Sequence, residues 1–350
     1  MRGGLVSALA ACMMSVASAQ SSVPGGRLDA YFDSLEKSGA VSGSFAVSER
    51  GVVRYRRSIG FATIENGVPQ PADAGTRYRI GGVSRLFTAA LALQFAERGK
   101  ITLDNRLAEF YPDLPNAIEI TYRNLLQQRS GLSDYTQAPD FGAWRTAPRT
   151  QAEMLAVITR GGVRFPPGER AEVNDTNYLL IGYMLEKVDE RSYDDILTRQ
   201  ILGKLGLVRT YFAGTGLAAT LESRSYRWTG EGWQPEVESD PTVDGGARGV
   251  VSNANDLAMY LDALFAGKVV TPHSLATMLG ENGNAGIGLE SVEMAGATGF
   301  GARGAIEAFE VFAYYFPERR VAIAWTGNAA RMPVDRILEE TAGIVFKRRK

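Results

Sequence analysis

Strand-like runs lie near both ends of the chain, with a long and mostly helical pattern between them. Residues 43–48 and 52–60 predict one hairpin, and residues 308–316 and 320–326 predict another. Strands this far apart in sequence can still complete one sheet if the chain returns to it. We therefore predict an α/β fold of the α+β type: an antiparallel sheet from both chain ends, flanked by helices, with an inserted and mainly helical region.

The helical pattern is clearest in the first amphipathic segment, residues 27–37, where Leu28, Tyr31, Phe32 and Leu35 recur at helical spacing. A closing helix is expected near the other end of the chain. The remaining predicted helices cover residues 84–98, 122–128, 151–159, 177–188, 193–201, 255–265 and about 333–346.

Length and composition suit a soluble protein with one substantial core. The chain has 350 residues, 45% of them hydrophobic, and shows neither repeats nor a low-complexity linker. We expect a single domain over residues 20–350, with its α/β part near 24–80 and 285–350 and its helical part near 81–284. A net charge of −1 argues against a nucleic-acid partner.

The first residues have the pattern of a bacterial export signal. Arg2 is followed by an apolar stretch over residues 5–16 and by Ala17-Ser18-Ala19, so cleavage is expected after Ala19. This stretch is too short for a transmembrane segment. We predict a periplasmic or secreted protein; the alternative is a lipoprotein processed at Cys12.

Cys12 is the only cysteine. Cleavage after Ala19 would therefore leave a mature chain without thiols. Disulfides, thiolate catalysis and cysteine metal sites are then excluded.

Four segments, in this order and spacing, carry a family resemblance. Residues 78–90 read Tyr-Arg-Ile-Gly-Gly-Val-Ser-Arg-Leu-Phe-Thr-Ala-Ala, and residues 125–135 read Leu-Leu-Gln-Gln-Arg-Ser-Gly-Leu-Ser-Asp-Tyr. Residues 165–168 and 249–257 supply Phe-Pro-Pro-Gly and Gly-Val-Val-Ser-Asn-Ala-Asn-Asp-Leu. Together they resemble the serine β-lactamase and penicillin-binding-protein superfamily, in the branch of class C β-lactamases, D-alanyl-D-alanine carboxypeptidases and esterases.

The resemblance implies a Ser-x-x-Lys pair at the start of the first middle helix. Such enzymes form an acyl-enzyme and need a hydroxyl nucleophile, a base and an oxyanion hole. Here Gly82 stands at the serine position and Arg85 at the lysine position. Glycine has no attacking oxygen, and a guanidinium keeps its proton and cannot act as a base. Ser84 lies about 200° around the helix from residue 82, so we interpret it as a packing or capping serine.

The other two family motifs are altered as well. The Tyr-x-Asn motif corresponds to Val173, Asn174 and Asp175, so the phenol is missing and asparagine is replaced by aspartate. The Lys-Thr-Gly or His-x-Gly motif corresponds to Ala302-Arg303-Gly304, where only the glycine is kept. We predict that Gly82, Arg85, Val173, Asp175, Ala302 and Gly304 line a former active site in which no residue is catalytic.

No other set of residues replaces this chemistry in the sequence. His273, the only histidine, follows Thr271-Pro272 and is expected on the surface at a helix start. One histidine and no mature cysteine make a zinc site improbable, and no cofactor is expected. The glycine-rich stretches 244–246 and 299–301 lack the context of a phosphate loop, so they are expected to be turns.

The replacements suggest contacts of their own. The family's lysine hydrogen-bonds its asparagine, so we expect Arg85 and Asp175 to form an ion pair that fills the old centre; the alternative is that the two face different ways. Arg303 and Arg248 could border the cleft and bind an anionic ligand there; the alternative, which we favour, is that both are solvated surface arginines. A carboxylate beside arginine should have a lowered pKa, which would make Asp175 a poor base.

Three function classes fit these residues. We predict an exported pseudoenzyme that binds a cell-wall peptide, another small anionic molecule or a protein partner. The first alternative is a hydrolase, such as a carboxypeptidase, esterase or β-lactamase, with an unrecognised nucleophile. The second is a non-hydrolytic enzyme that uses Asp175 as acid or base. Fold resemblance alone does not decide among them.

Overall fold

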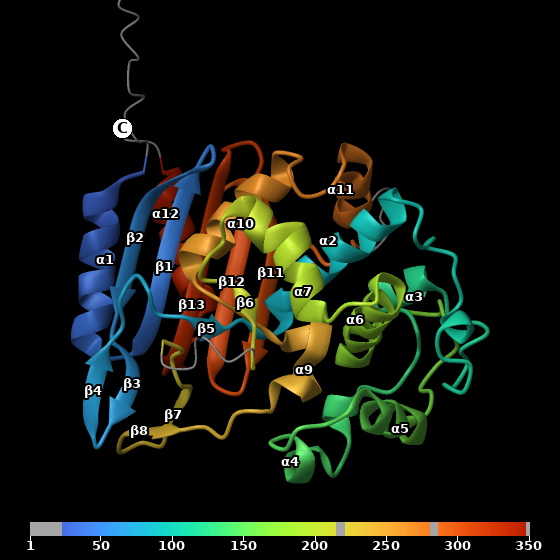
Figure 1. Cartoon of the computed structure of the whole chain (residues 1–350). Helices are drawn as coiled ribbons and strands as arrows, with labels where there is room; N and C mark the ends of the chain where they lie inside the picture. Colours follow the sequence, from blue (N-terminus) through green and yellow to red (C-terminus); the bar gives the residue numbers. More distant parts are fainter. Residues whose placement is uncertain (1–22, 215–220, 281–285, 348–350) are drawn as a thin grey trace, which may run out of the picture.

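A computed structural model describes residues 23–214, 221–280 and 286–347 (Figure 1). The predicted export signal and Cys12 lie outside the described residues. Within the described ranges, no helix is long and apolar enough to cross a membrane.

The main sheet joins the two ends of the chain, as the sequence predicts. Its strands follow the order β10-β11-β12-β13-β1-β2, and each neighbouring pair is antiparallel. The central pairing is β1 with β13, in which Phe45 lies opposite Trp325. The strands are β1 (Val41–Glu49), β2 (Val52–Ile59), β10 (Glu290–Met294), β11 (Ala297–Ile306), β12 (Phe309–Phe316) and β13 (Val321–Ala330).

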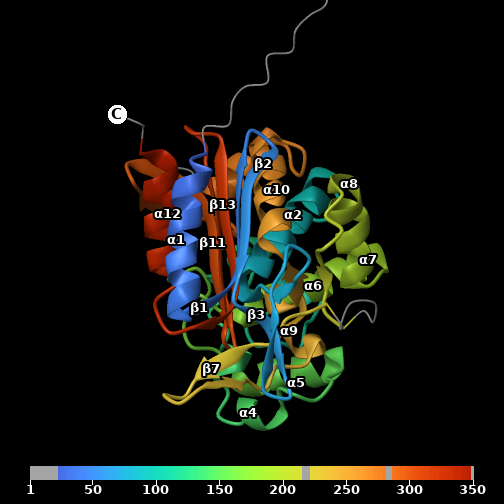
Figure 2. The ribbon, with the colours of Figure 1, turned by 90° about the vertical axis from the view of Figure 1, so that its left-hand side faces the viewer.

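Helices cover both faces of this sheet. On one face lie α1 (Gly25–Ser38) and α12 (Asp335–Phe346), and on the other lie α2 (Ser84–Glu97) and α10 (Ala254–Phe265) (Figure 2). The core between the sheet and helices α1 and α12, termed the outer core, is aromatic. In it, the Phe32 ring lies 4.9 Å from that of Phe45 and is stacked on Trp325 at 6.3 Å. The core on the opposite face of the sheet, termed the inner core, is larger and includes most side chains of α2.

The middle region packs against the inner face and is mainly helical. Every helix predicted there is present, with ends shifted by a few residues. Besides α2 and α10, its helices in the described residues are η1 (Gly81–Val83), η2 (Leu107–Glu109), α3 (Tyr122–Leu126), η3 (Tyr135–Gln137), α4 (Phe141–Trp144), α5 (Gln151–Gly161), α6 (Asp175–Asp189), α7 (Tyr193–Leu197), the π-helical turn η4 (Thr198–Leu202), α8 (Gly203–Leu205), α9 (Pro241–Arg248) and α11 (Pro272–Leu279).

The sequence analysis missed β10 and β11 of the main sheet, and it also missed several short strands. Although the hairpin of β7 and β8 falls within the region expected to be helical, β7 pairs with β13 and so extends the main sheet. The division of the domain near residues 80 and 284 stays a prediction. The short strands are β3 (Phe61–Glu65), β4 (Val68–Pro71), β5 (Tyr78–Arg79), β6 (Tyr211–Phe212), β7 (Tyr226–Trp228), β8 (Trp233–Pro235) and β9 (Val250–Ser252).

Both glycine-rich stretches expected to be turns belong to regular elements, so that expectation is wrong. Residues 299–301 lie inside β11, where a Cβ on Gly299 would be 2.7 Å from the Phe316 ring and one on Gly301 would strike the backbone of Ala313. Residues 244–246 lie in α9, which is kinked at Gly245 with φ 46° and ψ −146°. These glycines serve close packing and a kink, which sequence context did not separate from turns.

Candidate functional site

The start of α2 is the centre of the site. Gly82 is buried in η1, one residue before Val83 leads into the helix. A Cβ built on Gly82 would lie 2.5 Å from Nη2 of Arg85 and 3.1 Å from its Cζ. Real Cβ atoms essentially never make so short a contact. The guanidinium of Arg85 therefore occupies the space into which a side chain on residue 82 would extend.

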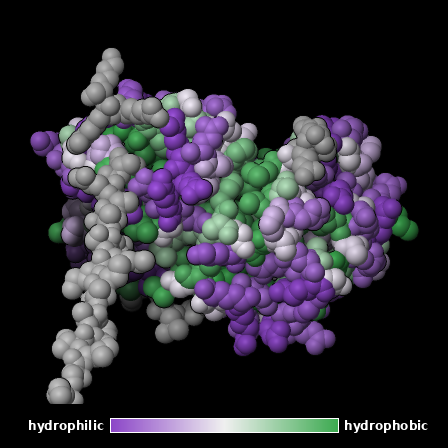
Figure 3. Space-filling model, turned by 90° about the horizontal axis from the view of Figure 1, so that it is seen from above, coloured by the Kyte–Doolittle hydropathy of each residue, from purple (hydrophilic) through white to green (hydrophobic). Residues whose placement is uncertain are grey.

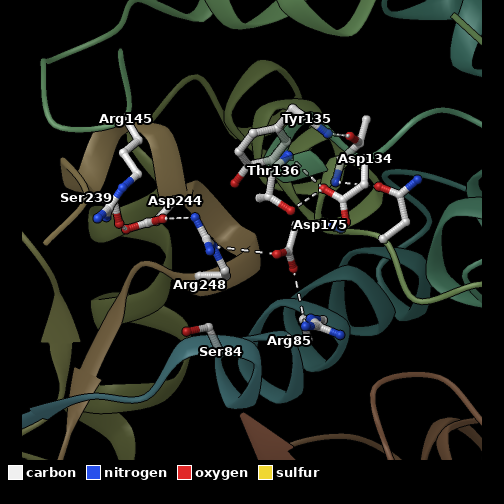
Figure 4. A network of polar contacts seen from close by, with 12 residues as sticks. Ser84, Arg85, Asp134, Tyr135, Thr136, Arg145, Asp175, Ser239, Asp244 and Arg248 are labelled. Atoms are coloured by element: carbon white, nitrogen blue, oxygen red, sulfur yellow. Dashed lines mark hydrogen bonds and ion pairs between the residues drawn. The ribbon is translucent and has the colours of Figure 1, made fainter. Parts of the chain in front are cut away.

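Arg85 is held in this position by Asp175, the first residue of α6. Its Nη2 lies 3.2 Å from Oδ1 of Asp175, so the ion pair expected from the sequence is present. The other carboxylate oxygen of Asp175 lies 3.5 Å from Nε of Arg248. Figure 4 shows the two arginines approaching Asp175 from different sides.

The ion pairs continue beyond Asp175 into the protein. Nη2 of Arg248 donates to Oδ1 of Asp244 at 2.6 Å, and Ser239 donates to the other oxygen of Asp244 at 2.8 Å. Nη1 of Arg79 lies 3.8 Å from both Asp244 and Glu307. Figure 4 shows part of this alternating network.

Most of the network is buried. The side chains of Asp244, Glu307 and Arg79 are 0%, 5% and 7% exposed. At the end of the network away from Asp175, Glu307 accepts a hydrogen bond of 2.8 Å from Nη1 of Arg145. The sequence analysis missed Asp244, Glu307, Arg79 and Arg145, because these residues lie far apart in the sequence and none stands at a catalytic position of the family motifs.

The pKa of Asp175 contradicts the sequence expectation. Burial raises it above the ordinary value, whereas Arg85 and Arg248 oppose that shift. The expected lowering was wrong because sequence spacing shows the neighbouring arginine but not the loss of solvent. A raised pKa removes one objection to acid–base chemistry at Asp175. The side chain is only 12% exposed, however, and does not line the adjacent cavity.

β11 passes directly across the start of α2. A Cβ on Gly304 would lie 2.6 to 2.7 Å from backbone atoms of Ile80, Gly82 and Val83. This close approach explains why glycine is retained at residue 304. Ala302 lies on the same strand, is 8% exposed and belongs to the inner core.

A cavity of about 490 Å³ opens beside this strand, lined by Arg85, Val173, Arg303 and Gly304 among others. Val173 is 69% exposed, so the position of the family's phenol carries an apolar side chain facing solvent. Gly82 and Ala302 are not among the lining residues. Of the six predicted positions, the structure thus brings Arg85, Val173 and Gly304 to one cavity.

The two arginines proposed for ligand binding are already paired. Nη1 of Arg303 lies 2.9 Å from Asp335, and its Nε lies 3.4 Å from Glu290. Arg248 has an 11% exposed side chain and contacts Asp175 and Asp244. Their role toward a ligand remains a prediction.

Two serine hydroxyl groups within the family segments already make hydrogen bonds. Oγ of Ser84 is fully buried and accepts a hydrogen bond of 3.1 Å from the Val250 amide, as expected for a packing serine. Ser130 is 1% exposed and donates to Oδ1 of Asn177 at 2.5 Å.

His273 is exposed near the start of α11, which Thr271 caps. In the described ranges, histidine, cysteine, aspartate and glutamate side chains form no group of three that could hold a metal ion.

Comparison with known proteins identifies the family of this chain. The sequence model named Beta-lactamase matches residues 28–344. The chain belongs to the Beta-lactamase family. Among curated relatives, the teichoic acid D-alanine hydrolase of Staphylococcus aureus is 24% identical to this chain over 180 residues. The matched residues make up 51% of this chain and 43% of the hydrolase. The chain spans about half the length of the curated relatives it matches.

Solved structures support the β-lactamase-like fold. The D-amino acid amidase of Ochrobactrum anthropi SV3 superimposes with a TM-score of 0.79 at 22% identity, over 91% of this chain and 96% of that one. A penicillin binding protein of Bacillus halodurans gives a TM-score of 0.77 at 20% identity, over 89% and 98%. At this identity the likeness shows the fold alone.

Proposed function

We propose that this chain is an exported member of the Beta-lactamase family that binds a small ligand without serine acyl transfer. The observation that carries the proposal is the contact between residues 82 and 85. The place of the nucleophile's side chain is taken by a guanidinium that can neither attack nor accept a proton.

Two further observations support the loss of acyl transfer. Arg85 is held by the buried carboxylate of Asp175, so freeing the space above Gly82 would break an ion pair. At residue 173, an exposed valine offers no hydroxyl for proton transfer. Because nucleophile, base and phenol work as a unit in such chemistry, restoring one position should not restore the reaction.

The cavity is better suited to a zwitterionic ligand than to a simple anion. Arg85 and Arg303 bring positive charge, but both are paired, and Glu290, Glu310 and Asp335 also line the cavity. A small D-amino acid derivative or a short peptide would present both an ammonium and a carboxyl or carbonyl group to this lining. The names of the relatives, a D-alanine hydrolase and a D-amino acid amidase, fit ligands of this kind.

A hydrolase is the second candidate, and the names of those relatives favour it. It would need a nucleophile other than residue 82. Ser84 and Ser130 would each have to leave a buried hydrogen bond to serve.

Intact-mass analysis after incubation with a penicillin and with a fluorophosphonate separates the two candidates. Nitrocefin and nitrophenyl-ester turnover should be measured on the same samples, with Ser84→Ala and Ser130→Ala as variants. We expect no stoichiometric adduct and no turnover above buffer. An adduct or a turnover that either variant abolishes would establish the hydrolase and reject our proposal.

Ligand binding is tested separately, by NMR titration with D-alanyl-D-alanine and with its L,L isomer as the control. We expect D-alanyl-D-alanine to shift resonances of residues around the cavity, and Glu310→Gln to weaken this binding. If neither dipeptide shifts them, the zwitterionic ligand class is wrong.

A further inference from the structure

A second cavity lies at the other end of the sheet and shares no lining residue with the first. It has a volume of about 570 Å³ and is formed by the β1–β2 and β12–β13 turns, by α8 and by the last turns of α10. Figure 3 looks onto this end of the molecule, where apolar residues gather between strongly hydrophilic areas. The volume lies within the range of small-molecule sites, roughly 300 to 1,000 Å³.

Part of the lining of this second cavity is apolar, and this part is termed its apolar interior. Leu205, Met259 and Phe265 are half-buried and line it together with Tyr315. The rings of Phe265 and Tyr315 are stacked at 4.4 Å, which gives the cavity a rigid aromatic wall. Such a surface favours an apolar body over a fully hydrated ion.

Four cations surround this apolar interior: Arg50, Lys204, Lys268 and Arg320. All four are exposed, and in the described part of the chain none has a carboxylate within 4.0 Å. Lys204 donates to the side-chain carbonyl of Gln200 at 3.3 Å, which leaves its charge uncompensated.

Two of these cations are fixed next to each other by the backbone. The amide of Arg50 donates to the carbonyl oxygen of Arg320 at 2.9 Å, which ties the two hairpin turns together. Both arginines have left-handed backbone angles, with φ of 55° and 54°. Glycine or asparagine would adopt this conformation more easily, so the fold places arginines where the backbone does not favour them.

One carboxylate, Asp262, also lines the cavity. It is 6% exposed and accepts a hydrogen bond from the hydroxyl of Ser48, so it is turned into the protein. Four cations therefore face one buried acid across an apolar interior.

We propose that this cavity binds an amphipathic anion, with a carboxylate or phosphate head among the four cations and a single acyl chain on the apolar interior. Charge complementarity selects the head, and the aromatic wall selects the chain. The hollow shape distinguishes this occupant from a membrane, which would require a flat or protruding surface. The proposal does not depend on the function of the first cavity.

Isothermal titration calorimetry with dodecyl phosphate, kept below its micelle concentration, tests the proposal on the mature protein. We expect one molecule to bind per chain. The double variant Arg50→Asn with Arg320→Asn should weaken binding at least tenfold, and asparagine tolerates the left-handed backbone at both positions. The control is Arg27→Gln with Arg336→Gln, which removes the same charge from exposed positions on α1 and α12 and should change the Kd less than twofold.

Three further titrations of the unaltered protein decide what is recognised. Dodecyl maltoside has the same chain with a neutral head, and inorganic phosphate has the head without a chain; both should bind at least tenfold more weakly than dodecyl phosphate. Equal binding of either compound would overturn the proposal. It would also be overturned by no binding of dodecyl phosphate, by equal losses in the two double variants, or by binding only to phosphatidylglycerol vesicles, which would indicate a membrane surface.

Discussion

The guanidinium of Arg85 lies where a side chain on Gly82 would begin, 2.5 Å from an ideal Cβ. The two positions are therefore coupled: a larger residue at 82 must shift the guanidinium that is paired with Asp175. We expect Gly82→Ala to destabilise the protein by about 1–2 kcal/mol, in the range of overpacked sites. In an Arg85→Ala background, the same change should cost less than about 0.5 kcal/mol, because the obstructing group is gone. Urea unfolding of the four proteins gives this coupling, and equal costs in the two backgrounds would contradict it.

The carboxylate of Asp175 forms ion pairs with two arginines, Arg85 at 3.2 Å and Arg248 at 3.5 Å. Asp175→Ala should cost about 2–3 kcal/mol, because it removes the ion-pair partner of the half-buried Arg85 and one of the two partners of Arg248. The exposed pair of Arg160 and Asp140, at 3.1 Å, is the control, and Arg160→Ala should cost less than about 1 kcal/mol. Chemical denaturation measures both losses. Similar small losses for the two variants would show that the Asp175 contacts are not structural.

The sequence was sufficient to predict the main helices and four strands of the main sheet, β1, β2, β12 and β13, but not β10 or β11. Their sequence signals are local. In α1, for example, Leu28, Phe32 and Leu35 recur at helical spacing, and all three are buried. The pair of Arg85 and Asp175 was also predictable, because the family pattern aligns both positions. The interpretation of residues 299–301 as a turn failed because a glycine needed for packing against Phe316 looks the same in sequence as a turn glycine.

Long-range burial was beyond what local patterns could predict. Asp244 and Glu307 are 63 positions apart and become buried neighbours of Arg79 only when α9 meets the β11–β12 turn. The direction of the Asp175 pKa depends on the same burial. For this reason, the network around the start of α2 could not be predicted from the sequence, although its first ion pair could.

Gly304 offers a sharper packing test than Gly82. An added Cβ would meet only backbone atoms, at 2.6 to 2.7 Å, and these cannot rotate away. We expect Gly304→Ala to destabilise the protein by about 2–3 kcal/mol. Gly26→Ala in α1 is the matched control: it has open space and should be neutral or stabilising by up to about 1 kcal/mol. Thermal unfolding compares the two, and a tolerated Gly304→Ala would mean that β11 does not press on the start of α2 as described.

Asp262 gives the protein a predictable pH dependence. Burial raises the pKa of Asp262 from 3.8 to about 6, although the Gly51 amide and Lys268 oppose the shift. Between about pH 4 and 6 the folded protein therefore keeps a proton that the unfolded chain has lost, so this group's contribution to stability falls as pH rises through that window. Asp262→Asn stays neutral, and its stability relative to the unaltered protein should rise by about 1–2 kcal/mol between pH 4 and 7, after allowance for solvent screening. Urea unfolding at a series of pH values measures this difference, and a flat or falling difference would show that Asp262 does not titrate in this way.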